Sequence, residues 1–311
     1  MTLYGSIDGG YTNKQDKNGV SNTNFGSAIT KSNRIGFKGT EDLGGGLKAL
    51  FVLETGFNAG KETSTSIGDR GAFLGLAGGF GTVTLGSSQL TPSFYAGAAV
   101  NPTGSDNFGL LNYAIGTRFD NSVNYQSPAL FGGLVLRGAM IQKADNKGTA
   151  ANDISATYTR GGLTLAASAG DNGFDKGTMI GGAYNFGMFE VFVRATESAA
   201  TAGSTGNEFS QTTSTTPGKL ASLTVLPTNA VKYTNIGVSV PLTSAIVLAA
   251  DFEQRKVQDA TNFKGDTIVA SAKYSLSKRT AMTAYVKKAD QPVGTLANDG
   301  TEFGFGIGHT F

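Results

Sequence analysis

The last eleven residues of the chain, 301–311, alternate between two kinds of side chain. Side chains of a β-strand point alternately to its two faces, so this segment predicts a strand with one apolar face and one small or polar face. The apolar face carries Phe303, Phe305, Ile307, His309 and Phe311. One such strand fits the core of a soluble protein as well as a membrane-facing wall, so the rest of the chain must decide.

The same alternation recurs along the whole sequence. Residues 267–275 set an apolar row against a mostly polar row. The first row is Ile268, Ala270, Ala272 and Tyr274, and the second is Thr267, Val269, Ser271, Lys273 and Ser275. Near the start of the chain, Ile35 and Phe37 alternate with Arg34 and Lys38 in the same way. A period of two predicts strands rather than helices throughout.

The connections between these strands are alternately short and long. The short ones carry turn residues, mostly glycine, which supplies the positive φ of tight hairpins. They are 42–46, 78–81, 127–133, 160–162, 185–187, 241–244 and 276–279. The long ones are polar: 13–31, 58–69, 91–117, 143–152, 197–229, 256–264 and 288–300, with a brief member at 171–176. Seven short and eight long connections predict sixteen strands.

Short turns at one end and long loops at the other are typical of an outer-membrane β-barrel. Lipid offers no hydrogen-bond partners to the backbone, so the sheet must close, and sixteen tilted strands enclose an aqueous channel. A soluble double-sheet protein would also alternate, but strands so rich in Gly and Ala would give it a thin core. We therefore expect an all-β fold, a 16-stranded antiparallel transmembrane β-barrel formed as a single domain by residues 1–311.

Composition excludes several other classes. No apolar run approaches about 18 residues, so no transmembrane helix is predicted. The absence of Cys removes disulfides and cysteine metal sites, and a net charge of +2 gives no basic footprint for nucleic acid. No signal peptide is visible, because residues 2–11 are already strand-like, and Met1 can stand in place of a removed leader. The only histidine, His309, lies on the last predicted strand, which leaves no candidate general base for a hydrolase.

Several stretches together resemble the general porins of Gram-negative bacteria, in the branch typical of neisserial and burkholderial outer membranes. They are Thr2–Asp8, Ser32–Ala49, Gly71–Leu76, Asn121–Pro128 and Gly304–Phe311. The resemblance implies a homotrimer of 16-stranded barrels with short periplasmic turns in the cell outer membrane, surrounded by lipid and lipopolysaccharide. It also implies that the third extracellular loop, about residues 89–117, folds into the lumen as a constriction.

The resemblance also implies a set of pore residues. Arg34, Arg70 and Arg118 occupy positions where the family places arginines on the wall opposite the inward loop, and Lys38 shares a face with Arg34. Asp106 is the only charged residue of the loop segment 89–117, where family members often carry more acids. A further arginine often follows the motif at 85–86, but this chain has Ser87 there.

The expected function is passive diffusion of small hydrophilic solutes and ions, with a weak preference for anions and without an enzymatic reaction or cofactor. A substrate-selective porin is one alternative, and a structural or adhesive barrel acting through its long loops is another. Acids such as Asp8, Glu190, Asp251 and Glu253 are expected on the lumen face, where they balance the arginines. Closure of the barrel further predicts that residues 2–11 pair with 301–311.

Overall fold

A computed structural model describes residues 1–27, 29–60, 66–101, 110, 114–141, 151–171, 175–200, 230–258, 264–290 and 300–311. The chain forms one large antiparallel sheet and one short two-stranded sheet. The large sheet consists of β1 (Thr2–Asp16), β2 (Ser21–Ser27), β3 (Arg34–Gly44), β4 (Leu47–Gly56), β5 (Gly71–Gly78), β6 (Gly81–Ser87), β9 (Ser122–Gln126), β10 (Leu134–Ile141), β11 (Ala151–Arg160), β12 (Leu163–Asp171), β13 (Asp175–Asn185), β14 (Glu190–Ala200), β15 (Val231–Pro241), β16 (Ile246–Val257), β17 (Lys264–Ser275), β18 (Thr280–Asp290) and β19 (Gly300–Thr310).

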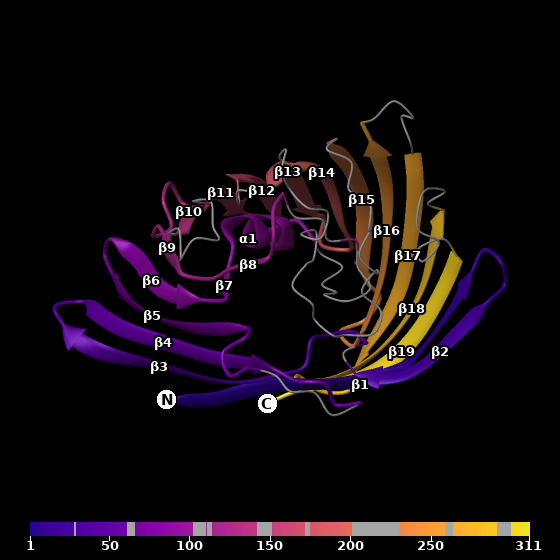
Figure 1. Cartoon of the computed structure of the whole chain (residues 1–311), viewed down its shortest axis with the longest axis horizontal. Coiled ribbons are helices and arrows are strands. Elements are labelled where there is room, and N and C mark those ends of the chain that lie inside the picture. Colours follow the sequence, from indigo (N-terminus) through magenta and orange to yellow (C-terminus); the bar gives the residue numbers. More distant parts are fainter. Residues whose placement is uncertain are drawn as a thin grey trace.

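The large sheet closes on itself, because β1 pairs with β19 at the other end of the chain. Figure 1 shows β1 beside β19, with the N- and C-termini on the same side of the molecule. The predicted pairing of the two ends is confirmed, but its register differs: Ser6–Asp16 lies opposite Gly300–Thr310. The difference arises because β1 continues to Asp16, five residues beyond the predicted end of that pairing.

Seventeen strands of this sheet form sixteen positions around the barrel wall. One half of β1, Gly9–Gln15, pairs with β2, and its other half, Thr2–Ser6, pairs with β3. The strands β2 and β3 therefore follow one another along the same position of the wall. Every other strand of the sheet takes a position of its own, and the 16-stranded antiparallel barrel is confirmed.

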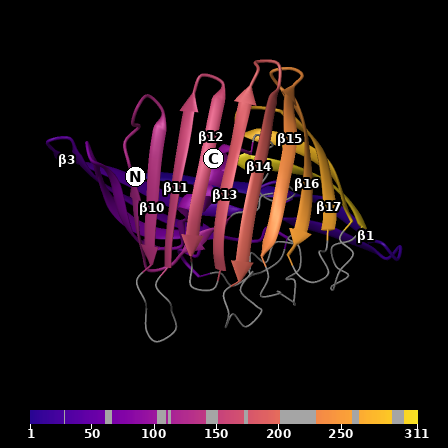
Figure 2. The same cartoon turned by 90° about the horizontal axis from the view of Figure 1, so that it is seen from above.

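The seven short turns all join neighbouring strands of the wall, as the sequence predicts, and Figure 2 shows several of them at one end of the barrel. Strands extend further than predicted into the polar connections at the other end. The clearest case is 13–31, expected to be a loop, where β1 and β2 continue as a hairpin with Lys14 opposite Asn22. Tyr11 and Phe25 stack edge to face across it, with ring centroids 5.0 Å apart.

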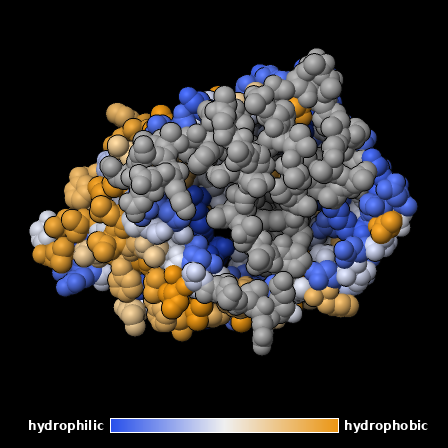
Figure 3. Space-filling model, in the orientation of Figure 1, coloured by the Kyte–Doolittle hydropathy of each residue, from blue (hydrophilic) through white to orange (hydrophobic). Residues whose placement is uncertain are grey.

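The two faces of the wall differ as the alternation predicts. On β17, Ile268 is 52% exposed on the outer face, whereas Thr267 and Val269 point inward and are buried. On β19 the outward row includes Phe303, Phe305 and Ile307, all exposed. Figure 3 shows hydrophobic residues gathered on the flank over β3–β6 and hydrophilic residues toward the middle. No helix among the described residues is long and apolar enough to cross a membrane.

The segment after β6 turns into the barrel. It contains β7 (Gln89–Leu90), helix α1 (Pro92–Ala99) and β8 (Arg118–Phe119), and β7 and β8 pair with each other as the second sheet. Figure 1 shows α1 inside the ring of strands. The helix packs against the inner face of the wall, where Ala96 and Val100 form a buried cluster with Ala114, Ala166 and Met179. At Gly177 the approach is so close that a Cβ would lie 1.7 Å from the carbonyl oxygen of Ala114.

Candidate functional site: arginines beside the inward segment

The inward segment, which we define as residues 89–117, is closed at its base by one threonine. Thr91 donates its backbone N–H to the Thr117 carbonyl at 3.1 Å and its hydroxyl to the Gly116 carbonyl at 2.9 Å. Its hydroxyl oxygen also accepts from the Phe94 backbone N–H at 3.1 Å, which caps α1. The two ends of the segment are thus held together where they leave the wall.

A carboxyl group on the wall beside α1 holds the start of this helix. Asp153 of β11 accepts hydrogen bonds from the backbone N–H of Ser93 at 2.6 Å and from its hydroxyl at 2.7 Å. Both residues are fully buried. Backbone N–H groups at a helix N-terminus have no partner within the helix, so this carboxyl group satisfies one of them while it fixes the helix against β11.

Ser87, which stands where the family often has arginine, has a structural role. Its hydroxyl donates to Asp120 at 2.6 Å, and the backbone N–H of Ser88 donates to the same carboxylate oxygen at 2.8 Å. Burial alone would raise the pKa of Asp120, but these hydrogen bonds outweigh it and lower the pKa. Ser87 therefore contributes no positive charge to the lumen and instead ties the end of β6 to the residues that follow β8.

The three predicted arginines converge on one carboxylate, Glu54 of β4. Arg70 Nε lies 2.9 Å from Glu54 Oε1, Arg34 Nε lies 3.8 Å from Oε2, and Arg118 Nη2 lies 3.9 Å from Oε1. Tyr4 donates its hydroxyl to Oε2 at 3.0 Å. Burial, and then the positive charge of Arg70, lower the pKa of Arg118 to about 10, so it keeps its charge at neutral pH.

Lys38 and Arg118 make further contacts. Lys38, on the same strand as Arg34, places its Nζ 5.0 Å from the centre of the Tyr4 ring. Arg118 belongs to β8, at the base of the inward segment, rather than to the opposite wall where the resemblance places it. From there it donates to the backbone carbonyls of Arg70 and Ser88. Asp106 lies outside the described residues.

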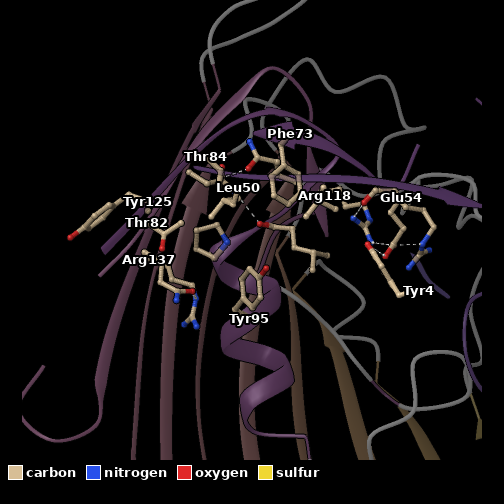
Figure 4. Close-up of a pocket in the computed structure, with 18 residues that line it drawn as sticks. Tyr4, Leu50, Glu54, Phe73, Thr82, Thr84, Tyr95, Arg118, Tyr125 and Arg137 are labelled. Atoms are coloured by element: carbon tan, nitrogen blue, oxygen red, sulfur yellow. Dashed lines mark hydrogen bonds and ion pairs between the residues drawn. The ribbon is translucent and has the colours of Figure 1, made fainter. Parts of the chain in front are cut away.

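A cavity of about 350 Å³ opens between the arginine cluster and the inward segment. Figure 4 shows Arg118, Glu54 and Tyr4 together in one part of it and Arg137 in another. Sequence reasoning missed Arg137 of β10, whose Nε donates to Gln126 at 3.0 Å and whose guanidinium lies 4.7 Å from the centre of the Tyr95 ring. It also missed Glu54. The alternation of lumen-facing positions places both residues on the lumen face, but nothing in the sequence pairs them with these partners.

His309, Asp8 and Glu253 lie on the faces of the wall that the sequence predicts. His309 is exposed on the outer face of β19, and its Nδ1 lies 2.9 Å from the Thr280 hydroxyl. Asp8 and Glu253 are buried on the lumen face. Glu253 accepts from the Asn235 amide at 2.9 Å, and Asp8 accepts from the Thr30 backbone N–H at 2.9 Å. None of these contacts creates a nucleophile beside a general base.

Comparison with known proteins identifies the family. The sequence profile described as Gram-negative porin matches residues 1–305. The chain is 43% identical over 113 residues to the major outer membrane protein P.IB of Neisseria gonorrhoeae. This match covers 35% of this chain and 32% of that protein. It is also 35% identical over 156 residues to an outer membrane porin protein of Bordetella pertussis, a match that covers 42% of this chain and 40% of that protein. The matched regions thus span about a third to two fifths of these relatives.

The fold has a counterpart among solved structures. The anion-selective porin from Comamonas acidovorans superposes with a TM-score of 0.77 at 21% identity, over 100% of this chain and 99% of that one. At that identity the likeness concerns the fold alone, and it agrees with the closed 16-stranded wall described above. Because the family profile matches nearly the whole length, the chain belongs to the Gram-negative porin family and forms a β-barrel of the outer membrane.

Proposed function

We propose that the barrel is a passive diffusion pore for small hydrophilic solutes and ions, with a weak to moderate preference for anions. The observation that carries this proposal is the charge around Glu54. Three guanidinium groups face one carboxylate, which leaves a formal charge of three minus one, or +2. Fixed positive charge on a low-dielectric lumen wall enriches anions there, and rows of Arg favour anion passage.

The proposed narrowest section lies between this cluster and the inward segment, residues 89–117. Arg34, Arg70 and Arg118 supply its positive charge, and Lys38 adds to it. Asp106 opposes them from the inward segment, so anions are preferred without strict exclusion of cations. A solved structure with the same fold is described as an anion-selective porin, and the preference proposed for this chain rests on its own charges.

We also propose that the barrel works as a homotrimer embedded in outer-membrane lipid and lipopolysaccharide, with no cofactor. The outer face of β3–β6 exposes Ile35, Phe51, Leu74 and Leu85, an apolar surface that suits either lipid or a second copy of the chain. Light scattering of the detergent-solubilised protein measures the oligomer, and a monomer at all concentrations would contradict the trimer.

Charge reversal in planar bilayers tests the selectivity. At low salt, Arg34→Glu combined with Arg70→Glu should change the sign of the reversal potential under a KCl gradient. Arg279→Glu, in the exposed turn between β17 and β18, is the matched control and should leave it unchanged. The effect should weaken at high salt, because the Debye length falls from about 10 Å at 0.1 M to about 3 Å at 1 M. An unchanged potential in the double variant would contradict the proposal.

The two alternatives give different currents in the same apparatus. A substrate-selective porin shows saturation or block by its substrate, and the cavity beside Arg118 is the feature that favours this possibility. A structural or adhesive barrel carries little current. A general pore is expected to show stepwise increases in current as channels insert. Each channel should have an ohmic conductance that does not saturate with salt.

A further inference from the structure

One wall of the cavity beside the arginine cluster is apolar. Val52 of β4 and Phe73 of β5 lie directly opposite each other in the register, and Leu50 lies two residues from Val52 on the same face. Glu54 shares that face, so alternation turns all four side chains toward the lumen. The lumen of a porin-like barrel is ordinarily polar. Three apolar side chains grouped there need a reason other than contact with lipid.

The inward segment adds apolar surface to the same cavity from the other side. Leu90, Pro92 and the ring of Tyr95 line it together with Leu50, Val52 and Phe73. Tyr95 remains 40% exposed, and the three wall residues are only half-buried, so these side chains border open space rather than pack tightly together. The start of α1 is held by Asp153, which keeps Pro92 and Tyr95 in place.

The charges that line the cavity are mostly positive. Among the described residues lining it they are Arg70, Arg118 and Arg137 against Glu54. Glu54 is already engaged by Arg70 at 2.9 Å and by the Tyr4 hydroxyl. Figure 4 shows the Leu50 and Phe73 side chains between Arg118 on one side and Arg137 on the other. The cavity therefore offers an apolar surface with a guanidinium within reach on either side.

We propose that this cavity is a transient binding subsite for small aromatic monocarboxylates. It deepens the proposed function and rests on it, since an anion must first be admitted to the lumen. The ring of such a solute packs against Val52, Phe73 and the exposed face of Tyr95, and its carboxylate pairs with Arg118 or Arg137. An aromatic ring offers both apolar area and a face for stacking, and Arg is suited to carboxylates.

The size of the cavity fits this class of ligand. About 350 Å³ lies at the lower end of the roughly 300–1,000 Å³ typical of small-molecule sites. Inorganic anions would use the arginines alone and gain nothing from the apolar wall. Binding must remain weak, because a solute that crosses a pore has to leave the site again.

Block of the ionic current is the test, with benzoate as the probe. Benzoate is added to one side of a bilayer that contains the full-length protein, and acetate and benzyl alcohol serve as the charge-only and ring-only comparisons. Benzoate should reduce the KCl conductance along a saturating curve, whereas the other two should not saturate. If benzoate and acetate have the same effect, the subsite is contradicted.

Variants locate the block. Val52→Thr combined with Phe73→Ser should weaken benzoate block roughly tenfold, and Arg137→Gln should also weaken it. Val135→Thr is the matched control: it removes a lumen-facing valine two residues from Arg137 on β10, outside the residues lining the cavity, and should leave the block unchanged. Val52→Thr alone keeps the volume of the side chain, so it serves if the double variant does not assemble.

The reversal potential separates this proposal from the one on which it rests. The apolar variants remove no charge, so their anion preference in KCl should equal that of the wild type. A wild-type pore that prefers anions but shows equal block by benzoate and acetate would overturn the subsite and leave the pore proposal standing. A wild-type preference for cations would overturn both.

Discussion

The attachment of α1 to the wall can be broken with a single side chain, Asp153. Its carboxyl group is fully buried and accepts two hydrogen bonds from Ser93, at 2.6 and 2.7 Å. In Asp153→Ala both Ser93 donors lose their acceptor. A buried donor left without a partner costs about 1–3 kcal/mol, so two of them cost about 2–6 kcal/mol.

This cost acts on the inward segment and not on the barrel, because the backbone ladders of β11 with β10 and β12 are untouched. Since 1.4 kcal/mol corresponds to a factor of ten, even the lower bound raises the population of the detached segment by about 25-fold. Single-channel recording should then show frequent fluctuations between conductance levels where the wild type is steady. The unfolding temperature of the barrel should change little.

A matched variant shows whether the buried hydrogen bonds are responsible. Asp171→Asn alters another carboxylate, at the end of β12, whose contact with Lys176 is partly exposed, and surface ion pairs contribute only about 0–1 kcal/mol. It should leave the current trace unchanged. If Asp153→Ala gave a trace as steady as that of the wild type, with the same conductance, the carboxyl group would not be what holds the segment.

Two further predictions concern close approach and the lipid-facing wall. Gly177→Ala should change the single-channel conductance, because the added methyl group would meet the Ala114 carbonyl. Gly138→Ala on β10, which has open space around it, should not. A Gly177→Ala conductance equal to that of the wild type would contradict the contact. Ile268→Arg should destabilise the barrel by about 2–4 kcal/mol if the residue lies near the bilayer midplane, and Ser271→Arg on the inner face of the same strand should be nearly neutral, as measured by denaturant unfolding in lipid vesicles.

The strands and the two faces of each strand were predictable from the sequence, because contact with lipid restricts which side chains can point outward. Every outward position within the membrane must be apolar, so a period of two is visible in segments such as 267–275 and 301–311. Beyond the membrane that requirement ends. Residues 13–27 are polar except for Val20 and Phe25, yet they form the β1–β2 hairpin. No sustained alternation marks these strands, and the sequence predicts a loop there.

The site was predictable only in part. Arg34 and Arg70 were found from motifs, and the structure places both of them against Glu54. Glu54 lies opposite Gly36 in one neighbouring strand and Gly71 in the other, so its relation to the arginines depends on registers that the sequence does not specify. The position of Arg118 depends on the path of the inward segment, because contacts such as Asp153–Ser93 join residues 60 apart in the chain.

The central claim is that the charge around Glu54 makes this porin prefer anions, and one recording tests it most directly. The wild-type protein is placed in a neutral bilayer with KCl at about 0.1 M on one side and about tenfold less on the other, where screening is weak. The sign of the zero-current potential then shows which ion carries more of the current. We expect the zero-current potential to have the sign produced when chloride carries more of the current. Its magnitude should decrease as both salt concentrations are raised together. A potential with the sign set by potassium under these conditions would contradict the account.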